Sequence, residues 1–205
     1  MQINTQDSIR AVSPTGLILA GGRGRRMGGL DKGLEIYLGR PLITHVLDVM
    51  RPVVSDILIS ANRHLGDYQR LGYRVVEDLH AEFEGPLAGL LRAMEASKGR
   101  SMLSAPCDTP RLSEEAFIRL MAVYQTGQYD LVMAHDGERL QPLVMVVGTH
   151  LKKSLADYLH EGGRRVDAWA HRHALGIEDF SDCPEIFFNI NTIAELNGSS
   201  GSRSR

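Results

Sequence analysis

The sequence predicts an α/β fold in which a mostly parallel sheet lies between two layers of helices. Short apolar runs of β-type alternate along the chain with longer runs of helical period. A glycine-rich segment follows the first short run directly, and polar or acidic residues follow several later ones. Strands that alternate with helices of about ten residues are typical of βαβ units, whose strands are parallel and buried on both faces.

Each predicted element combines a periodic pattern with a start or stop signal. The first helix has Pro41 in its first turn and apolar residues on one side. The hydroxyl of Ser113, followed by two glutamates, predicts the start of another helix. The predicted strands span residues 17–20, 56–61, 74–76, 102–105, 131–134, 143–147 and 186–190. The predicted helices span residues 41–54, 64–71, 86–96 and 151–159, and a further helix begins after Ser113.

The composition is that of a soluble globular protein, with 43% hydrophobic and 23% charged residues. The formal net charge of -2 supplies no overall attraction to nucleic acid or to an anionic membrane, so neither partner is expected. Two cysteines in different settings argue against a disulfide framework, and no apolar run approaches the roughly 20 residues that span a bilayer. A cytoplasmic location is therefore expected.

The 205 residues suffice for one domain with a buried core. Residues 15–197 carry the periodic pattern and form the predicted domain. Residues 1–14 have no clear pattern and are predicted to be a flexible extension. Residues 198–205 are rich in glycine and serine and are predicted to be a flexible tail. Neither end is expected to carry function.

The most informative segment is the glycine-rich, basic run over residues 19–32. Five glycines stand within nine positions, and three arginines and Lys32 accompany them. Glycine lets backbone N–H groups approach an anion closely, and the cations match the charge of several phosphates. Ligands of open α/β sheets bind at the carboxyl ends of the strands, where this segment must lie. The segment therefore predicts a triphosphate site, and the alternative is a solvated basic surface loop.

Two common nucleotide motifs do not fit this segment. A Walker A loop needs glycine before its lysine and Ser or Thr after it, whereas Asp31 precedes Lys32 and Gly33 follows it. The dinucleotide fingerprint requires its third glycine one residue earlier than Gly28. The chemistry for holding phosphate remains, but in a different fold from either motif.

The run over residues 19–32 resembles the signature of GT-A-like nucleotidyltransferases, and in particular that of the molybdenum cofactor guanylyltransferases. The resemblance covers about residues 15–197, and it implies a three-layer Rossmann-like fold with a mostly parallel mixed sheet. It also implies transfer of GMP from GTP to molybdopterin, with Mg²⁺ as cofactor. The supporting motifs, in order, lie at residues 61–63, 77–78, 85–89, 106–110, 135–138 and 189–192.

Two aspartates end predicted strands and are candidates for metal or nucleotide binding. Asp108 stands between two prolines, which stiffen its turn, and Asp78 follows the strand 74–76. Topology brings both to the same edge of the sheet, and Mg²⁺ needs only one or two carboxylates besides phosphate oxygens. The resemblance assigns Asp108 to the metal and Asp78 to the nucleotide. The alternative for each is an ordinary turn or cap.

The resemblance implies a set of nucleotide-binding residues, and Lys32 and Asp108 within it are the expected catalytic pair. The Gly21-Gly22 pair is associated with members that use guanine. Related guanylyltransferases often carry asparagine where this chain has Ser60, whose hydroxyl can still form a hydrogen bond. The expected GTP-binding residues are Leu19, Ala20, Gly21, Gly22, Arg26, Lys32, Ser60, Asn62, Asp78 and Asp108.

The expected acceptor site combines two asparagines with two arginines. In the predicted strand 186–190 and just after it, alternation puts Asn189 and Asn191 on one face. The resemblance suggests that both hold the pterin, and the alternative is turn chemistry and capping of the next helix. Arg164 and Arg165, beside a Gly-Gly turn, are candidates for the acceptor phosphate, and solvated surface arginines are the alternative.

Two other functions stay open at this point. One is cytidylyl transfer to molybdopterin or to a sugar-alcohol phosphate, and the other is nucleotide sensing without turnover. The set of Lys32, Asp78 and Asp108 argues against a pure sensor, because such a protein needs no metal carboxylate. The resemblance also implies other molybdenum cofactor biosynthesis proteins and molybdoenzyme chaperones as partners.

Overall fold

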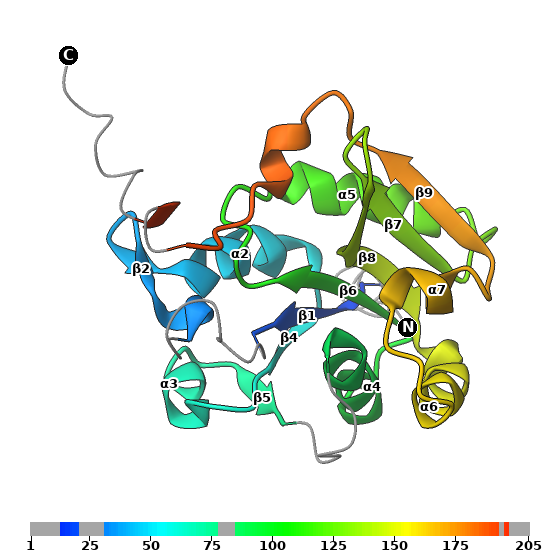
Figure 1. Cartoon of the computed structure of the whole chain (residues 1–205), viewed down its shortest axis with the longest axis horizontal. Coiled ribbons are helices and arrows are strands. Elements are labelled where there is room, and N and C mark those ends of the chain that lie inside the picture. Colours follow the sequence, from blue (N-terminus) through cyan, green and yellow to red (C-terminus); the bar gives the residue numbers. More distant parts are fainter. Residues whose placement is uncertain (1–12, 21–30, 78–84, 193–194, 197–205) are drawn as a thin grey trace, which may run out of the picture.

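A computed structural model of the protein describes residues 13–20, 31–77, 85–192 and 195–196. Its centre is a seven-stranded sheet with the order β5-β4-β1-β6-β8-β7-β9 (Figure 1). The strands are β1 (Thr15–Leu19), β4 (Asp56–Ser60), β5 (Arg74–Val76), β6 (Ser101–Pro106), β7 (Leu131–His135), β8 (Leu140–Gly148) and β9 (Leu175–Asp179). Residues 1–12 of the predicted extension 1–14, and the predicted tail from residue 198, lie outside the described residues.

Strand direction confirms the prediction of a mostly parallel, mixed sheet. β5, β4, β1 and β6 pair in parallel, as do β7 and β9. β8 pairs antiparallel with both of its neighbours, β6 and β7. Because β8 alone in this sheet is reversed, the carboxyl ends of the other six strands lie along one edge.

The described helices agree with the predicted ones in place and order, apart from one short addition. They are α2 (Leu42–Met50), α3 (Leu65–Gln69), α4 (Pro86–Ala96), α5 (Glu114–Tyr124), α6 (Lys152–His160) and the unpredicted α7 (Val166–Ala170). Four 3₁₀ turns and a small hairpin complete the described chain: η2 (Lys32–Leu34), η3 (Arg51–Val53), η4 (Thr149–Leu151), η5 (Pro184–Phe187), β2 (Ile36–Tyr37) and β3 (Arg40–Pro41).

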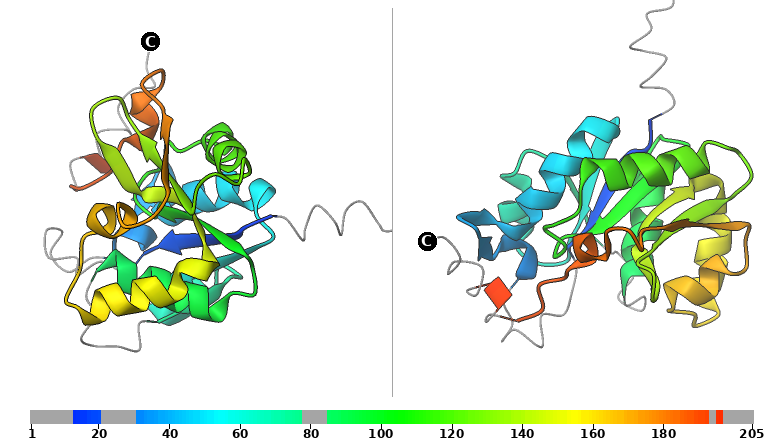
Figure 2. Two further views of the ribbon diagram at one scale, coloured as in Figure 1. Left: turned by 90° about the vertical axis from the view of Figure 1, so that its right-hand side faces the viewer. Right: turned by 90° about the horizontal axis from the view of Figure 1, so that it is seen from above.

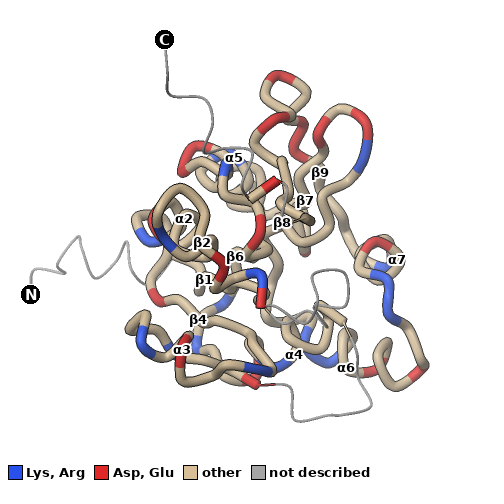
Figure 3. Tube along the Cα trace, turned by 60° about the vertical axis from the view of Figure 1, so that its left-hand side comes forward, with Lys and Arg blue, Asp and Glu red and all other residues tan. Residues whose placement is uncertain are grey.

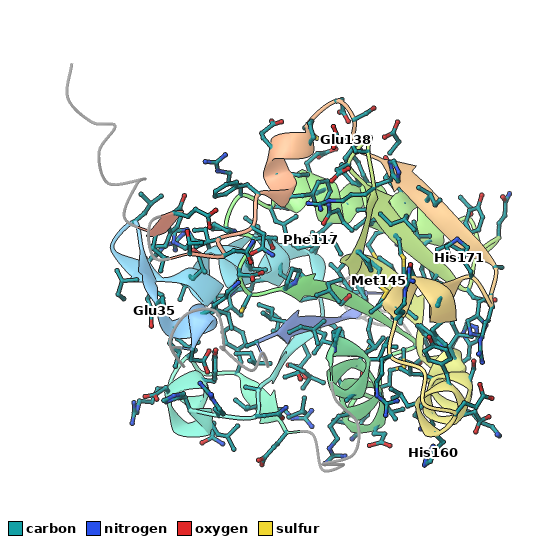
Figure 4. All side chains as sticks on the ribbon, viewed as in Figure 1. Glu35, Phe117, Glu138, Met145, His160 and His171 are labelled. Carbon is teal, nitrogen blue, oxygen red and sulfur yellow. The ribbon has the colours of Figure 1, made fainter. Side chains whose placement is uncertain are left out.

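The predicted three layers are present, with α2 and α5 on one face of the sheet and α4 and α6 on the other (Figures 1 and 2). Each face has its own apolar core. Fully buried Phe117 of α5 lies in the first core, between its helix and the sheet (Figure 4). Fully buried Trp169 of α7 lies in the second core, together with residues of α4 and α6.

Local sequence signals explain where the helices begin and end. The Ser113 side chain accepts a hydrogen bond from the Ala116 N–H at 3.2 Å, so the predicted N-cap of α5 is confirmed. α2 begins immediately after Pro41 and gives way to η3 one residue before Pro52, because proline cannot donate the next helical hydrogen bond. Boundaries therefore follow the proline and hydroxyl positions in the sequence.

The predicted strand at residues 186–190 is wrong. That region contains η5 and an irregular segment, and the last strand, β9, lies earlier in the chain. Pro184 starts the 3₁₀ turn, and Phe187 stacks edge-on against Phe180 with ring centroids 5.4 Å apart. The Ile190 N–H donates to the Asp108 carbonyl at 3.0 Å. The segment is therefore hydrogen-bonded to the turn at Asp108 and not to a strand of the sheet.

The strand ends form a row that positions the candidate site. Register pairs Val76 with Ser60, Ser60 with Leu19, and Leu19 with Pro106. The segments after these four residues therefore emerge side by side at the carboxyl edge of the sheet. Lysine, arginine, aspartate and glutamate are intermixed along the described chain (Figure 3). Among the described residues no helix has the length and apolar character needed to cross a membrane.

Candidate active site

Three predicted site residues, far apart in the sequence, meet at this edge of the sheet. The Lys32 ammonium donates to Asp108 Oδ2 at 3.1 Å and to Asn191 Oδ1 at 2.8 Å. The side chains of Lys32 and Asp108 are 25% and 14% exposed, so the ion pair is largely shielded but open on one side. A cation and a carboxylate held together beside the strand ends form a suitable receptor for phosphate and metal.

Backbone hydrogen bonds hold Asp108 in place. The Cys107 N–H donates to the Leu19 carbonyl at 3.1 Å, which extends the β1–β6 pairing past the strand ends. The Thr109 hydroxyl donates to the Pro106 carbonyl at 3.1 Å, which closes the turn. The Ile190 N–H on the Asp108 carbonyl adds the late segment to the same structure. These three hydrogen bonds therefore fix the turn that contains Asp108.

Two oxygens of the site are buried without a hydrogen-bond partner among the described residues. They are Asp108 Oδ1 and Asn189 Oδ1. A buried polar atom without a partner costs free energy, so such atoms commonly mark a ligand or ion position. Carboxylate and amide oxygens are the hard ligands that Mg²⁺ prefers. The donor set therefore fits a magnesium ion.

The described residues contain no cluster of three or more His, Cys, Asp or Glu side chains able to hold a metal ion. His160 on α6 and His171 after α7, for example, lie apart near the surface (Figure 4). Mg²⁺ typically keeps waters and takes one or two carboxylates together with substrate phosphates. The donor set around Asp108 matches that mode of binding, in which the nucleotide completes the coordination.

The Asn191 segment is ordered by a capping box, which agrees with the capping given above as the alternative for this segment. The Thr192 N–H donates to Glu195 Oε2 at 2.9 Å, and the Glu195 N–H donates to Thr192 Oγ1 at 3.2 Å. The Asn191 N–H also donates to Glu195 Oε2, at 2.6 Å. These backbone hydrogen bonds lower the pKa of Glu195, that from Asn191 most. Capping therefore fixes Asn191, while its amide oxygen accepts from Lys32.

The sequence predicted that Asn189 and Asn191 share one face of a strand. The segment is irregular, so strand alternation does not place them. The Asn189 amide oxygen is buried, whereas Asn191 is exposed and binds Lys32. Both residues flank Ile190, which is hydrogen-bonded to the Asp108 turn. The structure therefore brings the two asparagines to the site by a different local conformation from the predicted one.

The remaining described nucleotide candidates lie at the ends of β1 and β4. The Ala20 N–H donates to the Ser60 carbonyl at 2.8 Å, directly after Leu19. Ser60 is only 3% exposed, and its hydroxyl side faces Gly89 of α4. Asn62, two residues further, is exposed. Four expected nucleotide ligands, Gly21, Gly22, Arg26 and Asp78, lie outside the described residues.

The two candidate acceptor arginines lie on the connection between α6 and α7. The Arg164 guanidinium donates to the carbonyls of Leu159 and Gly163, at 2.9 and 2.7 Å. Arg165 is 78% exposed and pairs with Asp167 at 2.5 Å. Two views place α7 at the opposite end of the long axis of the molecule from β2 (Figures 1 and 2). Their role as acceptor ligands stays a prediction.

Sequence reasoning missed a buried tyrosine beneath the site. Tyr68 of α3 is fully buried, and its hydroxyl donates to Asp31 Oδ1, one residue before Lys32. Burial raises the pKa of Tyr68, so the phenol keeps its proton and remains a donor. An apolar residue is the usual expectation at such a position, and no short motif identifies the contact. The pattern Thr-x-x-Glu at Thr192, by contrast, was a readable signal for the capping box.

Cys107, the residue before Asp108, is a buried structural residue. It is 6% exposed, and burial raises the pKa of its thiol well above the usual value. The charges of Asp108 and Asp31 raise that pKa further. A thiol held protonated in this way is a poor nucleophile. Cys107 therefore packs beneath the turn and does not supply the reactive group.

A family model described as the MobA-like NTP transferase domain matches residues 16–174. The chain is 41% identical over 176 residues to a molybdenum cofactor guanylyltransferase of Shewanella sp. (strain MR-4), covering 86% of this chain and 89% of that protein. It is 40% identical over 176 residues to the protein of the same name from Shewanella sediminis, covering 86% and 90%.

Structural similarity agrees with these sequence matches. A crystal structure of molybdopterin-guanine dinucleotide biosynthesis protein A from Archaeoglobus fulgidus superposes with a TM-score of 0.74. The match covers 90% of this chain and 96% of that one at 22% sequence identity, which supports the fold. The family match spans the strand-end row, Lys32 and Asp108. The chain belongs to the family of MobA-like NTP transferase domains.

Proposed function

We propose that this protein is a molybdenum cofactor guanylyltransferase. It transfers GMP from GTP to molybdopterin, releases pyrophosphate and forms molybdopterin guanine dinucleotide. The names of relatives about 40% identical over most of the chain support this assignment. The structural observation that carries it is the contact of Lys32 Nζ with Asp108 Oδ2, at 3.1 Å, beside the other Asp108 oxygen, which is buried without a hydrogen-bond partner in the described part of the chain.

The reaction follows from charge. A phosphate oxygen of the acceptor forms a new bond to the α-phosphorus of GTP, and the bond from that phosphorus to the bridging oxygen of the β-phosphate breaks. The electron pair leaves with pyrophosphate. The attacking oxygen is already ionised at neutral pH, so the protein needs no general base. Lys32 offsets the repulsion between the two anions and the charge that develops on the leaving group.

Asp108 Oδ1, together with substrate phosphate oxygens, would hold Mg²⁺. The buried amide oxygen of Asn189 belongs to the segment that is hydrogen-bonded to the Asp108 turn through Ile190. When bound, the ion neutralises phosphate charge and aligns the reacting groups. Asn191 orients the Lys32 ammonium through its amide oxygen at 2.8 Å. Lys32 and Asp108 are the proposed catalytic pair, since both contact the position that the phosphates would occupy.

The other ligands are proposed from their places around this pair. Leu19, Ala20, Ser60 and Asn62 lie at or just after the strand ends and would contact the nucleotide. Asn189 and Asn191, and more remotely Arg164 and Arg165, would hold the acceptor. Gly21, Gly22, Arg26 and Asp78 complete the proposed GTP site. We also propose a cytoplasmic location, with other molybdenum cofactor biosynthesis proteins and molybdoenzyme chaperones as partners.

Pyrophosphate release tests the proposed function. The purified chain is incubated with Mg²⁺ and each of GTP, CTP, ATP and UTP, with and without molybdopterin. The expected result is release that requires both GTP and molybdopterin. Release with CTP in place of GTP would overturn the base assignment. Tight GTP binding without turnover on molybdopterin would contradict the enzymatic function and favour a nucleotide sensor.

A further inference from the structure

Tyr68 is a buried polar group close to the catalytic pair that the proposed reaction does not use directly. It has no exposed surface, and its hydroxyl donates a hydrogen bond to Oδ1 of Asp31, which lies 37 positions earlier in the sequence. Asp31 is the residue immediately before Lys32 and stands at the start of η2. The phenol of α3 therefore holds the backbone from which the catalytic lysine projects.

The close approach of Tyr68 depends on a glycine. A Cβ atom on Gly33 would lie 2.5 Å from the Tyr68 hydroxyl oxygen, which is far inside van der Waals contact. The glycine lets η2 pack directly on the phenol. Tyr68 and Cys107, the neighbour of Asp108, also belong to the same apolar core. The phenol therefore packs directly against the segment that carries Lys32, and it shares a core with the residue before Asp108.

The hydrogen bond also controls where a second carboxylate points. Lys32 has Asp31 as its chain neighbour and Asp108 as its ion-pair partner. With its oxygen held by Tyr68, Asp31 is directed into the protein toward α3. Without that donor, the Asp31 carboxylate would lose this hydrogen bond and would be free to turn toward the ammonium group of the adjacent Lys32. It would then compete with phosphate for the ammonium group.

We infer that Tyr68 is a positioning residue, which fixes Lys32 over Asp108 and keeps the Asp31 carboxylate away from the Lys32 ammonium. The inference rests on the proposed function, since it assigns Lys32 a role in transferring a nucleotide. It concerns the rate of the chemical step more than substrate affinity, because Tyr68 is buried beneath the site and touches no substrate.

The test is Tyr68→Phe, which removes one oxygen and keeps the ring. We expect kcat for nucleotidyl transfer to fall about tenfold, with KM for GTP changed by less than about threefold, since a lost orienting contact acts on the transition state. Tyr124→Phe is the matched control, because Tyr124 is half-buried on α5, away from the site, and it should keep the wild-type kcat. Wild-type kcat in Tyr68→Phe would overturn the inference, whatever the change in Tm.

A double-mutant cycle separates positioning from a general structural effect. If Tyr68 acts through Lys32, Tyr68→Phe should have no further effect on kcat in a Lys32→Ala background. An equal loss of kcat in both backgrounds would show that Tyr68 acts independently of the lysine. That result would overturn the inference even if Tyr68→Phe is slow in the otherwise wild-type chain.

A structural readout keeps the inference distinct from the proposed function. In a crystal structure of unliganded Tyr68→Phe we expect Lys32 Nζ to leave Asp108 and to approach the Asp31 carboxylate. An unchanged Lys32–Asp108 contact would refute the inference without any assay. Conversely, absence of transfer by the wild-type chain with every nucleotide would refute the proposed function, while the position of Lys32 in the variant would still decide the role of Tyr68.

Discussion

At the scale of single residues, the Lys32–Asp108 pair is the centre of the proposed phosphate site. Two partly buried charges of opposite sign satisfy each other, and the Asn191 amide orients the cation. Removing one partner leaves the other charge shielded from water and uncompensated, which is costly. The pair therefore contributes to local order as well as to the proposed chemistry.

Asp108→Ala should lower turnover by at least about a hundredfold, because it removes both the proposed metal carboxylate and the partner of Lys32. The fold should persist, since backbone groups hold the turn. Pyrophosphate release and Tm are the measurements. Asp157→Ala, which removes an exposed carboxylate paired with Lys153 on α6, is the control. A wild-type rate in Asp108→Ala would exclude Asp108 from the metal site.

Lys32→Ala should lower kcat about a hundredfold or more if the ammonium stabilises charge in the transition state. Lys153→Ala serves as the comparison, because the Lys153 side chain is 85% exposed on α6. Separate values of kcat and KM for GTP are needed. A change confined to KM would mean that Lys32 contributes equally to binding of substrate and transition state, and that it is a binding residue alone.

At the scale of elements, one carboxylate joins three of them at the far edge of the sheet. Asp130, immediately before β7, accepts from His150 Nε2 of η4 at 2.9 Å and from the Ala174 N–H, just before β9, at 3.1 Å. Its own backbone N–H donates to the Ala174 carbonyl at 2.9 Å. The hydrogen bond from His150 is the main cause that lowers the pKa of Asp130.

This lowered pKa predicts a pH-dependent contribution to stability. The ionised form is favoured in the folded chain, so the contribution is complete above the unfolded pKa of about 3.9 and is lost as pH falls below it. Asp130→Asn should therefore lower Tm by about 2–4 °C at pH 7. Thermal unfolding at pH 7 and near pH 3 is the measurement. A Tm difference that persists unchanged near pH 3 would contradict an ionic origin.

At the scale of the whole molecule, the two apolar cores hold the helices against a sheet whose carboxyl edge carries the site. Phe117 anchors the first core from α5, and Trp169 anchors the second from α7. Both are fully buried. Because the site is assembled from segments that leave different strands, its geometry depends on the packing of both faces.

Phe117→Ala should destabilise the fold by about 3–5 kcal/mol, since it leaves a cavity between α5 and the sheet. That loss is a large part of the roughly 5–15 kcal/mol by which domains are stable. Urea unfolding should show a lower midpoint, and activity should fall only where the variant unfolds. Ile118→Ala, at a 45% exposed position next in the chain, should change the midpoint little. Equal effects of the two changes would contradict the assigned core.

Much of the fold was predictable because its signals are local. The runs that became β4, β5, α4 and α5 carried their period and their end signals in the sequence. The short elements α7, β2 and β3 were missed, since five residues or fewer give too little period to read. β9 was also missed. It lies at the edge of the sheet and is only partly buried, so its five residues include few apolar ones. The strand predicted at residues 186–190 failed because apolar residues there pack into cores without joining the sheet.

The sequence by itself determined the order of the longer helices and of the main strands as far as β8, and the placing of Asp108 after a strand, since periodicity and turn chemistry act over a few residues. It also placed Lys32 at the end of a phosphate-type segment. Only the tertiary structure decided that Asn191 reaches Lys32 across 159 positions and that Tyr68 holds Asp31 across 37. Such contacts depend on how the whole sheet and its helices pack, and no local pattern specifies them.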